Sequence, residues 1–417
     1  TRRTIMRYYK RKNPMLIREM IRNVYKECKG VPKSNCLTKE QRLSLQMDEF
    51  MNRRYEFRYN TQIGEVEYRE RFSFRFYFHP IDKRAQNSIM LDAQSEGIGV
   101  WDRDIDRYLH SNRVPIYNPL EEFLFHLPHW DGKDRIHALA NRVPCNNPHW
   151  ELLFHRWFLN MVSHWRGVNK MYANSTSPIL VGAQGTHKST FCREMIPPAL
   201  RAYYTDSIDF SQKRDAELYL NRFALINIDE FDQITLTQQG FLKHILQKPV
   251  VNLRKPHGRS VLELQRYASF IGTSNQKDLL TDPSGSRRFI CIEVTGNIDT
   301  TQPIDYEQLY AQAMHEISHG ERYWFNSEDE QIMTENNREF EQTPAMLQLF
   351  YQYFRAPKAG EEGEFFTPVE ILNYLKKKSG ISLSDNKVYH FGRMLQKCGI
   401  SSKHTYKGTV YQVVKIL

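Results

Sequence analysis

Residues 177–190 read Ser-Pro-Ile-Leu-Val-Gly-Ala-Gln-Gly-Thr-His-Lys-Ser-Thr, an apolar run followed by a turn with two glycines, a lysine and two hydroxyl side chains. A strand that turns directly into a helix through such a loop is a common cradle for the phosphates of a nucleotide. The backbone N–H groups of the turn face the phosphates, the lysine supplies positive charge, and a hydroxyl binds Mg²⁺. The stretch therefore predicts a phosphate-binding loop between a buried strand and a helix.

Nine consecutive residues form the predicted nucleotide-binding loop: Gly182, Ala183, Gln184, Gly185, Thr186, His187, Lys188, Ser189 and Thr190. We expect Lys188 to neutralise the β- and γ-phosphates and Ser189 to bind Mg²⁺, with Thr190 as the alternative hydroxyl. His187 departs from the usual pattern, in which a glycine precedes the lysine. A side chain there restricts the backbone torsions and can alter the affinity for the phosphates or the rate of turnover. The alternative interpretation is an ordinary glycine turn before a helix.

Two further apolar runs end in polar residues that suit the same chemistry. Residues 222–232 carry the pair Asp229-Glu230, and residues 267–275 end with Asn275. Strands buried on both faces of a parallel sheet are continuously apolar and deliver such residues to one edge. We expect Asp229 to hold Mg²⁺, Glu230 to orient the attacking water and Asn275 to contact the γ-phosphate. Taken singly, each run also fits a plain core strand that ends in a polar loop.

Two adjacent arginines, Arg287 and Arg288, precede a fourth apolar run at residues 289–293. An arginine supplied by a neighbouring subunit can stabilise the charge that develops on a transferred phosphoryl group. The alternative is that both arginines pair with surface acids. We expect a finger that acts in trans, with Arg288 as the first candidate, and therefore a homo-oligomer.

Together these motifs resemble the virulence-associated protein E (VapE)-like ATPases, relatives of the superfamily III helicases and of the primase-helicases of viruses, phages and mobile elements. The similarity covers roughly residues 85–295 and rests on residues 182–190, on Asp229-Glu230, on Gly-Thr-Ser-Asn at 272–275, on Thr-Asp-Pro-Ser-Gly-Ser-Arg-Arg-Phe at 281–289, and on residues 118–135, which include Trp130-Asp-Gly. The resemblance implies a P-loop core of the AAA+ type with ATP and Mg²⁺ as ligands. It also implies a ring-shaped oligomer, a hexamer, that acts on DNA during replication of a phage or mobile genetic element.

A basic hairpin is predicted just before the third core strand. In residues 249–264, two β-rich arms flank a turn, and the tip carries four residues predicted to bind DNA: Arg254, Lys255, His257 and Arg259. In the helicases that the chain resembles, the equivalent hairpin lines the central channel and grips the DNA backbone. The alternative is an exposed basic turn without a ligand.

The C-terminal region is typical of a winged helix. Residues 355–366 are rich in Gly, Pro and Glu and predict a linker. A capped helix begins at Thr367, a second helix runs to Lys397, and a hairpin follows. The second helix of such a domain enters a major groove, while the wing contacts phosphates. The predicted wing contacts are Lys403, His404 and Lys407. Docking onto another protein is the alternative role.

The N-terminal region predicts helices together with a hairpin. Residues 1–50 are helical in pattern with a basic start, and residues 52–79 alternate between aromatic and polar side chains, including the run 71–78. We expect the aromatic face to pack on neighbouring helices, and the alternative is a platform for single-stranded nucleic acid. The predicted domains are an N-terminal helical and hairpin domain with a segment that leads into the ATPase sheet (1–150), an ATPase domain (151–354), a linker (355–366) and a winged helix (367–417).

Composition agrees with a protein that binds nucleic acid. The 417 residues include 58 Lys and Arg against 48 Asp and Glu, a formal charge of +10 that favours a polyanionic partner such as single-stranded or forked DNA. The six cysteines form no C-x-x-C pair and predict free thiols in a reducing compartment. Because the sequence has no apolar run of about 18 residues and no signal peptide, we expect a cytoplasmic protein without a membrane partner.

These observations predict an enzyme, an ATPase that translocates on or unwinds DNA as a replicative or primase-associated helicase. One alternative is an ATPase switch or helicase loader that remodels protein–DNA complexes without unwinding, and the basic hairpin argues against it. Another is a non-catalytic origin-binding protein in which His187 marks a decayed nucleotide site, and the Asp229-Glu230 pair argues against that. No primase chemistry is recognisable, so a primase, if any, would lie in a preceding segment or be a partner, and a primase or other replication proteins are the candidate partners.

Overall fold

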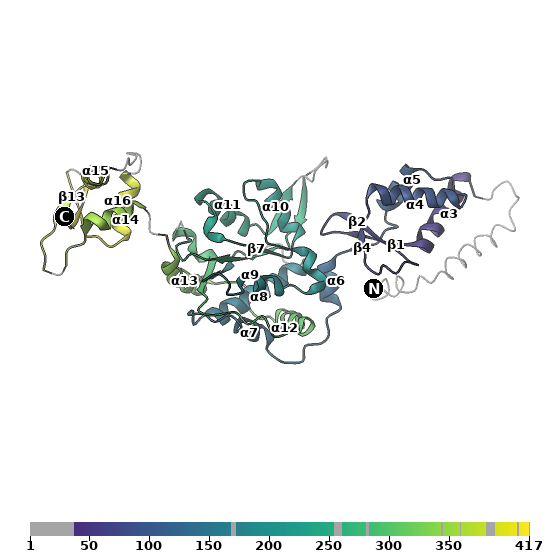
Figure 1. The fold of residues 1–417 in the computed structure, drawn as a ribbon, viewed down its shortest axis with the longest axis horizontal. Coiled ribbons are helices and arrows are strands. Elements are labelled where there is room, and N and C mark those ends of the chain that lie inside the picture. The colour runs from purple at the N-terminus through teal and green to yellow at the C-terminus, as the bar shows by residue number, and fades with distance from the viewer. Residues whose placement is uncertain are drawn as a thin grey trace.

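The computed structural model describes residues 37–167, 172–253, 261–280, 283–342, 345–358, 360–380, 388–406 and 408–416. These residues form three bodies in chain order, with an α/β body in the middle (Figure 1). Separate clusters of buried apolar side chains fill the N-terminal and C-terminal bodies, and two further clusters fill the central one. Among the described residues, no helix combines the length and apolarity needed to cross a membrane.

The N-terminal body is a small mixed sheet covered by helices. Its elements are α3 (Lys39–Arg54), β1 (Tyr55–Asn60), β2 (Glu65–Glu70), β3 (His79–Pro80), α4 (Lys83–Ser95), α5 (Asp102–Leu109) and β4 (Ile116–Tyr117), with strand order β3-β2-β1-β4. Phe57 of β1 lies opposite Tyr68 of β2, so both rings share one face of the hairpin. Phe57 also meets the Tyr108 ring of α5, with centroids 6.0 Å apart. For the β1–β2 hairpin, the expectation that the aromatic face packs on helices is confirmed; the rings of residues 72–77 are exposed instead.

The predicted alternation does not continue through residues 71–78. Strand β2 ends at Glu70, and β3 comprises only His79–Pro80. The Arg71 guanidinium donates to the Asn52 carbonyl oxygen (2.7 Å) and to Glu56 (2.6 Å), and these bonds draw the chain back toward α3 and β1 instead of along a ladder. For this run the strand prediction is wrong.

The central body contains a five-stranded parallel sheet. Its strands are β5 (Ser177–Val181), β6 (Tyr204–Thr205), β7 (Leu225–Ile228), β10 (Ser269–Ser274) and β11 (Phe289–Glu293), in the order β11-β5-β10-β7-β6. Every pair of neighbours in this sheet is parallel. Every residue of β5, β7 and β10 is buried, which explains why these strands read as continuous apolar runs. The α/β class with a parallel sheet is confirmed.

Helices cover both faces of this sheet (Figure 1). They are α6 (Pro119–Phe125), α7 (Arg135–Ala140), α8 (Trp150–Trp165), α9 (Lys188–Glu194), α10 (Lys213–Arg222), α11 (Leu236–Leu246), α12 (Tyr306–Ser318) and α13 (Ser327–Asn336). Leu180 belongs to the cluster with α8 and α12, whereas its neighbours Ile179 and Val181 belong to the cluster with α10 and α11. Residues 118–150, assigned to the N-terminal domain on the sequence, contribute apolar side chains such as Leu120 to this central core.

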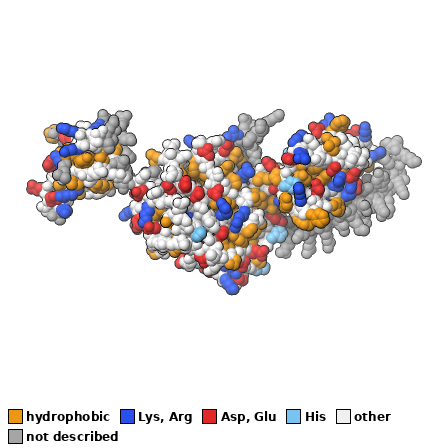
Figure 2. Space-filling model, viewed as in Figure 1, with side chains coloured by type: hydrophobic (Ala, Val, Ile, Leu, Met, Phe, Trp, Pro, Cys, Tyr) orange, Lys and Arg blue, Asp and Glu red, His pale blue; other side chains and the backbone are white. Residues whose placement is uncertain are grey.

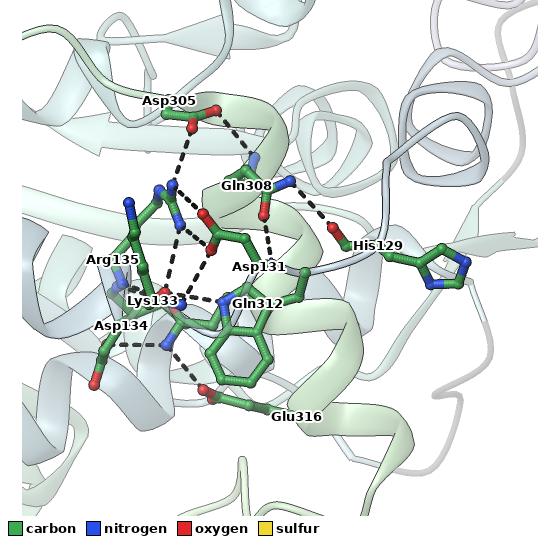
Figure 3. A network of polar contacts seen from close by, with 11 residues as sticks. His129, Asp131, Lys133, Asp134, Arg135, Asp305, Gln308, Gln312 and Glu316 are labelled. Atoms are coloured by element: carbon green, nitrogen blue, oxygen red, sulfur yellow. Dashed lines mark hydrogen bonds and ion pairs between the residues drawn. The ribbon is translucent and has the colours of Figure 1, made fainter.

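The segment around Trp130-Asp-Gly is fastened to α12 by polar contacts (Figure 3). The backbone N–H of Asp131 donates to Gln308 Oε1 (2.9 Å), and the two carboxylate oxygens of Asp131 accept from Arg135 at 2.6 and 2.9 Å. Gln312 Oε1 accepts from the backbone N–H of Arg135 at 2.6 Å. The hydrogen bond from Arg135 holds the pKa of the Asp131 carboxyl well below its usual range. These contacts give the segment a structural role, namely to hold the chain before the sheet against the core.

The C-terminal body contains the predicted pair of helices and the hairpin. Its elements are α14 (Ala345–Tyr353), β12 (Phe354–Arg355), β13 (Glu364–Phe366), α15 (Pro368–Ser379), α16 (Val388–Lys397), β14 (Ser402–Thr405) and β15 (Gly408–Lys415). As predicted, Thr367 caps α15 in a capping box with Glu370, and Gly380 ends the helix at a φ of 69°.

Residues 355–366, predicted to be a linker, instead begin and end in strands. Both β12 and β13 pair with β15, and α14 joins the same hydrophobic cluster as α15 and α16. Arg355 and Glu361 form two hydrogen bonds of 2.6 Å that close the intervening loop. The Gly, Pro and Glu content therefore marks a loop inside the C-terminal body, whose core begins within residues 345–353.

Candidate nucleotide-binding site

The predicted catalytic and phosphate-binding side chains come from the carboxyl ends of three adjacent strands. Strand β10 pairs with β5 on one side and with β7 on the other, so all three carboxyl ends lie at one edge of the sheet. β5 leads into the loop 182–187 and helix α9, β7 leads to Asp229-Glu230, and β10 leads to Asn275. The topology thus brings together residues that lie about ninety positions apart in the chain.

Lys188 is buried at the first position of α9, with its ammonium group among oxygen atoms. Its Nζ donates to the carbonyl oxygens of Gly182 and Ala183, both at 2.7 Å, and to Asn275 Oδ1 at 3.2 Å. Burial lowers the pKa of Lys188, while the nearby Asp229 carboxylate opposes the shift. The ammonium group of Lys188 therefore lies between the loop after β5 and the end of β10.

Asp229 links the start of α9 to the neighbouring strand. Its Oδ1 accepts a hydrogen bond from Ser189 Oγ at 3.0 Å and another from Thr273 Oγ1. A hydroxyl and a carboxylate oxygen thus lie side by side, and Mg²⁺ prefers oxygen ligands of this kind. Sequence reasoning missed Thr273. Its position two residues before Asn275 was the available signal, since alternate residues of a strand share a face.

The two glycines of the loop are required for different reasons, close packing at one position and backbone conformation at the other. A Cβ added at Gly182 would lie 2.9 Å from the carbonyl oxygen of Val294, so no side chain fits there. Gly185 has a φ of 85°, in the left-handed region that favours glycine. Thr186 Oγ1 donates to the Ala183 carbonyl oxygen at 2.9 Å and tightens the turn. The remaining loop positions Gln184 and Thr190 are exposed.

Two residues of the predicted site adopt a strained backbone. His187 has a φ of 65° and Glu230 a φ of 51°, and no other described non-glycine residue has a positive φ. Such conformations are uncommon for residues with a side chain, and they concentrate at functional sites. One precedes Lys188 and the other follows Asp229, so both strained positions adjoin the cation and carboxylate described above. This geometry also explains why glycine is the usual residue at position 187.

We expect His187→Gly to raise the free energy of unfolding by up to about 1 kcal/mol, because relief of left-handed strain exceeds the entropy that glycine adds to the unfolded chain. ATP hydrolysis should be retained or raised. Urea unfolding and a phosphate-release assay measure both effects. His149→Gly is the matched control, since His149 is also an exposed cap residue before a helix but has a φ of −97°. Glycine should destabilise the protein there. Equal destabilisation at both positions, or loss of hydrolysis in His187→Gly, would show that the imidazole has a role of its own.

The paired arginines lie at the amino-terminal ends of the strands, whereas the phosphate loop lies at their carboxyl ends. Arg287 and Arg288 directly precede β11, and Phe289 of β11 pairs with Ser177 at the amino end of β5. A five-residue strand spans about 15 Å, so the arginines are separated from their own chain's phosphate loop by that length. Arg287 also pairs with Glu330 of α13 at 3.0 Å, which is the surface pairing considered as the alternative. Arg288 is partly buried.

The predicted DNA-binding residues are described only in part. The hairpin arms β8 (Val250–Leu253) and β9 (Leu262–Gln265) pair in antiparallel register, which confirms the hairpin. The residues of its tip, Arg254, Lys255, His257 and Arg259, lie outside the described residues, as does Lys407 of the wing. Lys403 and His404 are exposed on β14, and the Lys403 ammonium lies 3.5 Å from the ring centroid of Phe365.

A buried arginine that sequence reasoning missed follows this hairpin directly. The Arg266 side chain is fully buried, and its guanidinium donates five hydrogen bonds of 2.7–3.1 Å to backbone carbonyl oxygens. The acceptors are Ala268, Asn174, and three residues at the end of α11 and just after it, Ile245, Leu246 and Lys248. Burial lowers the pKa of Arg266 to about 9, so the group stays charged at neutral pH. Arg266 thus joins the base of the hairpin to the core.

The chain belongs to the virulence-associated protein E-like domain family, whose model matches residues 124–342. This confirms the family that the motifs resemble. A second model, described as a domain of unknown function (DUF3874), matches residues 343–413. The two matches meet close to the start of α14, where the C-terminal hydrophobic cluster begins.

Solved structures align with most of the chain at low identity. The apo structure of the NrS-1 C-terminal region covers 89% of this chain and 98% of its own, with 12% identity and a TM-score of 0.44. The A-form apo structure of the same region covers the same shares, with 11% identity and a TM-score of 0.44. No curated protein matches the chain.

Proposed function

We propose that this protein is an ATPase that moves on DNA and unwinds it during replication of a phage or mobile genetic element. The observation that carries the proposal is the convergence of Lys188, Asp229 and Asn275 at the carboxyl edge of three adjacent strands. In open parallel sheets, ligands bind outside the carboxyl ends of the strands, so this edge is the expected place for a substrate.

The residues present fit ATP with Mg²⁺. Lys188 contacts four oxygen atoms within 3.4 Å, so phosphate oxygens could take the place of the loop carbonyls as its acceptors. The Ser189 hydroxyl and the Asp229 carboxylate would hold Mg²⁺, directly or through water, as one or two protein ligands commonly do for this ion. Bound Mg²⁺ would neutralise charge on the phosphates.

The remaining polar groups have separate roles in hydrolysis. Glu230 orients the water that attacks the γ-phosphorus, and its exposed position beside Asp229 leaves it accessible to that water. Asn275 already contacts Lys188, and its amide donates to the γ-phosphate. Positioning and charge stabilisation of this kind account for most of the catalysis of phosphoryl transfer.

The position of the arginines supports an oligomer. Because Arg287 and Arg288 lie a strand length from their own phosphate loop, an arginine that acts on ATP must serve a neighbouring subunit. Arg288 is the proposed finger, as on the sequence, and Arg287 pairs with Glu330 of α13 at 3.0 Å. We propose a ring-shaped homo-oligomer, a hexamer, in which the arginines of each subunit lie against the phosphate loop of the next.

The sheet and the two appended bodies suit a DNA motor. One strand, β10, separates the strand of the phosphate loop from the strand of the acidic pair, and this order supports an AAA+-type core. The β8–β9 hairpin is proposed to contact the translocating strand, and the C-terminal body to act as a winged helix on duplex DNA. Within that body, Lys403 and His404 are exposed on the hairpin, where phosphates can reach them.

A strand-displacement assay tests the proposal. With ATP and Mg²⁺, the purified protein should release a labelled strand from a forked duplex, and Glu230→Gln should release none. Forks with a single 5′ or 3′ tail will report the polarity. Hydrolysis of ATP without release from either fork would favour the helicase loader or switch. Absence of both hydrolysis and release would favour the non-catalytic origin-binding protein.

A further inference from the structure

Four aromatic side chains in the loop between β2 and β3 face solvent. The exposed fractions are 85% for Phe72, 96% for Phe74, 76% for Phe76 and 65% for Tyr77. Removing an aromatic ring from water is favourable, so a folded body rarely leaves several neighbouring rings in water without a partner for them. We call residues 71–78 the aromatic loop.

Both ends of the aromatic loop are anchored, so its exposed rings are held in place. At the start, Arg71 bonds to the Asn52 carbonyl oxygen at 2.7 Å. At the end, Arg69 donates to the carbonyl oxygen of Phe76 at 3.0 Å, and the Phe78 ring lies between the Arg58 and Arg69 guanidinium groups, 4.1 and 4.8 Å from them. Phe78 therefore anchors the loop, while Phe72, Phe74 and Phe76 are left in solvent and Tyr77 meets the His79 ring, with centroids 6.2 Å apart.

The charge around the aromatic loop favours an anionic partner. Residues 69–84 contain five Lys and Arg but only two acidic residues, and the loop itself contains Arg71 and Arg75 and no acid. Arg69 and Arg71 both pair with Glu56 of β1, so the positive charge that the loop offers to a partner is that of Arg75. On the face drawn in Figure 2, however, Lys and Arg mix with Asp and Glu over all three bodies and form no single basic surface. That face therefore offers no broad basic surface to a partner that binds through phosphates alone. A partner that carries flat apolar rings as well as negative charge fits the aromatic loop better.

We propose that the aromatic loop binds single-stranded nucleic acid by stacking its exposed rings on the bases. Every base has a flat π-face, so such stacking tolerates any sequence, and the bases of a duplex are not free to stack in this way. Arg75 adds a phosphate contact beside the rings. The site lies on the N-terminal body, separate from the nucleotide site, and needs no ATP.

Fluorescence anisotropy with labelled oligo(dT), without nucleotide, tests this site. Phe74→Ala combined with Phe76→Ala should weaken binding at least about tenfold, since one base stack is worth roughly a tenfold change or more. The slope of log affinity against log salt should stay the same, whereas Arg75→Ala should reduce it by about 0.7. Trp324→Ala is the matched control, because Trp324 is 51% exposed on the central body, and it should leave the affinity unchanged.

Three further measurements decide the outcome. An abasic oligonucleotide should bind the wild type and the double variant equally, because it has nothing to stack. Phe74→Trp should keep the affinity, and its added fluorescence should be quenched by oligo(dT). Equal affinity of wild type and double variant for oligo(dT) would overturn the proposal. If the double variant instead loses only self-association in sedimentation, the loop is a contact between copies of the chain. Because no ATP is present, failure here is distinct from failure of the proposed ATPase.

Discussion

Lys188→Ala is expected to abolish ATP hydrolysis, with a loss of at least about 100-fold in turnover, as is typical when a preorganised group that stabilises transition-state charge is removed. The expectation rests on the position of the ammonium group, which lies within hydrogen-bonding distance of both the phosphate loop and Asn275. An alanine would leave the phosphate charge uncompensated and would also remove the side-chain link between the phosphate loop and Asn275. Phosphate release at saturating ATP and Mg²⁺ measures the effect.

Glu230→Gln separates the chemical step from binding. Glutamine keeps the size of the side chain but cannot accept the proton or orient the water as a carboxylate does. Hydrolysis should fall as far as in Lys188→Ala, while a fluorescent ATP analogue should still bind. Lys213→Ala, on the exposed surface of α10, is the control and should hydrolyse at the wild-type rate. Turnover near that rate in Lys188→Ala or Glu230→Gln would contradict the assigned site.

Arg266→Met should lower the free energy of unfolding of the central body by about 3–5 kcal/mol, because it strips buried carbonyl oxygens of their donors. Methionine is similar in length and apolar, so the loss reports the hydrogen bonds and not a cavity. Urea unfolding followed by fluorescence is suitable, since Trp157 and Trp165 are fully buried in the central core.

Arg142→Met is the matched control for this change. Arg142 also donates to two carbonyl oxygens, of Gln302 at 2.8 Å and of Pro303 at 3.2 Å, but these bonds are open to solvent. Water can replace them, so the cost should stay below about 1 kcal/mol. If the two variants unfolded at the same urea concentration, the buried hydrogen bonds of Arg266 would contribute no more to stability than the exposed ones of Arg142.

Local features of the chain were predictable where the sequence pattern has one physical cause. The buried strands β5, β7, β10 and β11 appear as apolar runs because both of their faces are covered. The caps of α15 and the hairpin of β14 and β15 follow from Thr367, Gly380 and the glycine at 408, whose roles are local.

Other features depend on partners that are distant in sequence. Arg266 looks like any charged residue until the end of α11 and Asn174 enclose it. The alternation of residues 71–78 has the period of a strand, yet nothing in the pattern reveals that Arg71 turns back to Asn52. Likewise, the linker composition of residues 355–366 gives no sign that β15 pairs with both of its ends. Strand order and burial of charge are set by the tertiary fold and remained beyond local reasoning.

Because β10 lies between β5 and β7, residues at its end contact both the Lys188 part and the Asp229 part of the candidate site, so movement of one part affects the other. Thr273 contacts Asp229, which directly follows the neighbouring strand β7. Asn275, two residues later, contacts Lys188 at the start of α9, after the loop that follows the other neighbour, β5. A displacement of this one strand along its axis would shift both contacts together. The strand is closely packed at Gly272, where an added methyl group would come within 2.8 Å of the Ile179 side chain. Under the roles proposed for Asn275 and Asp229, a substitution that changes phosphate affinity through Asn275 should therefore also change metal affinity through Asp229.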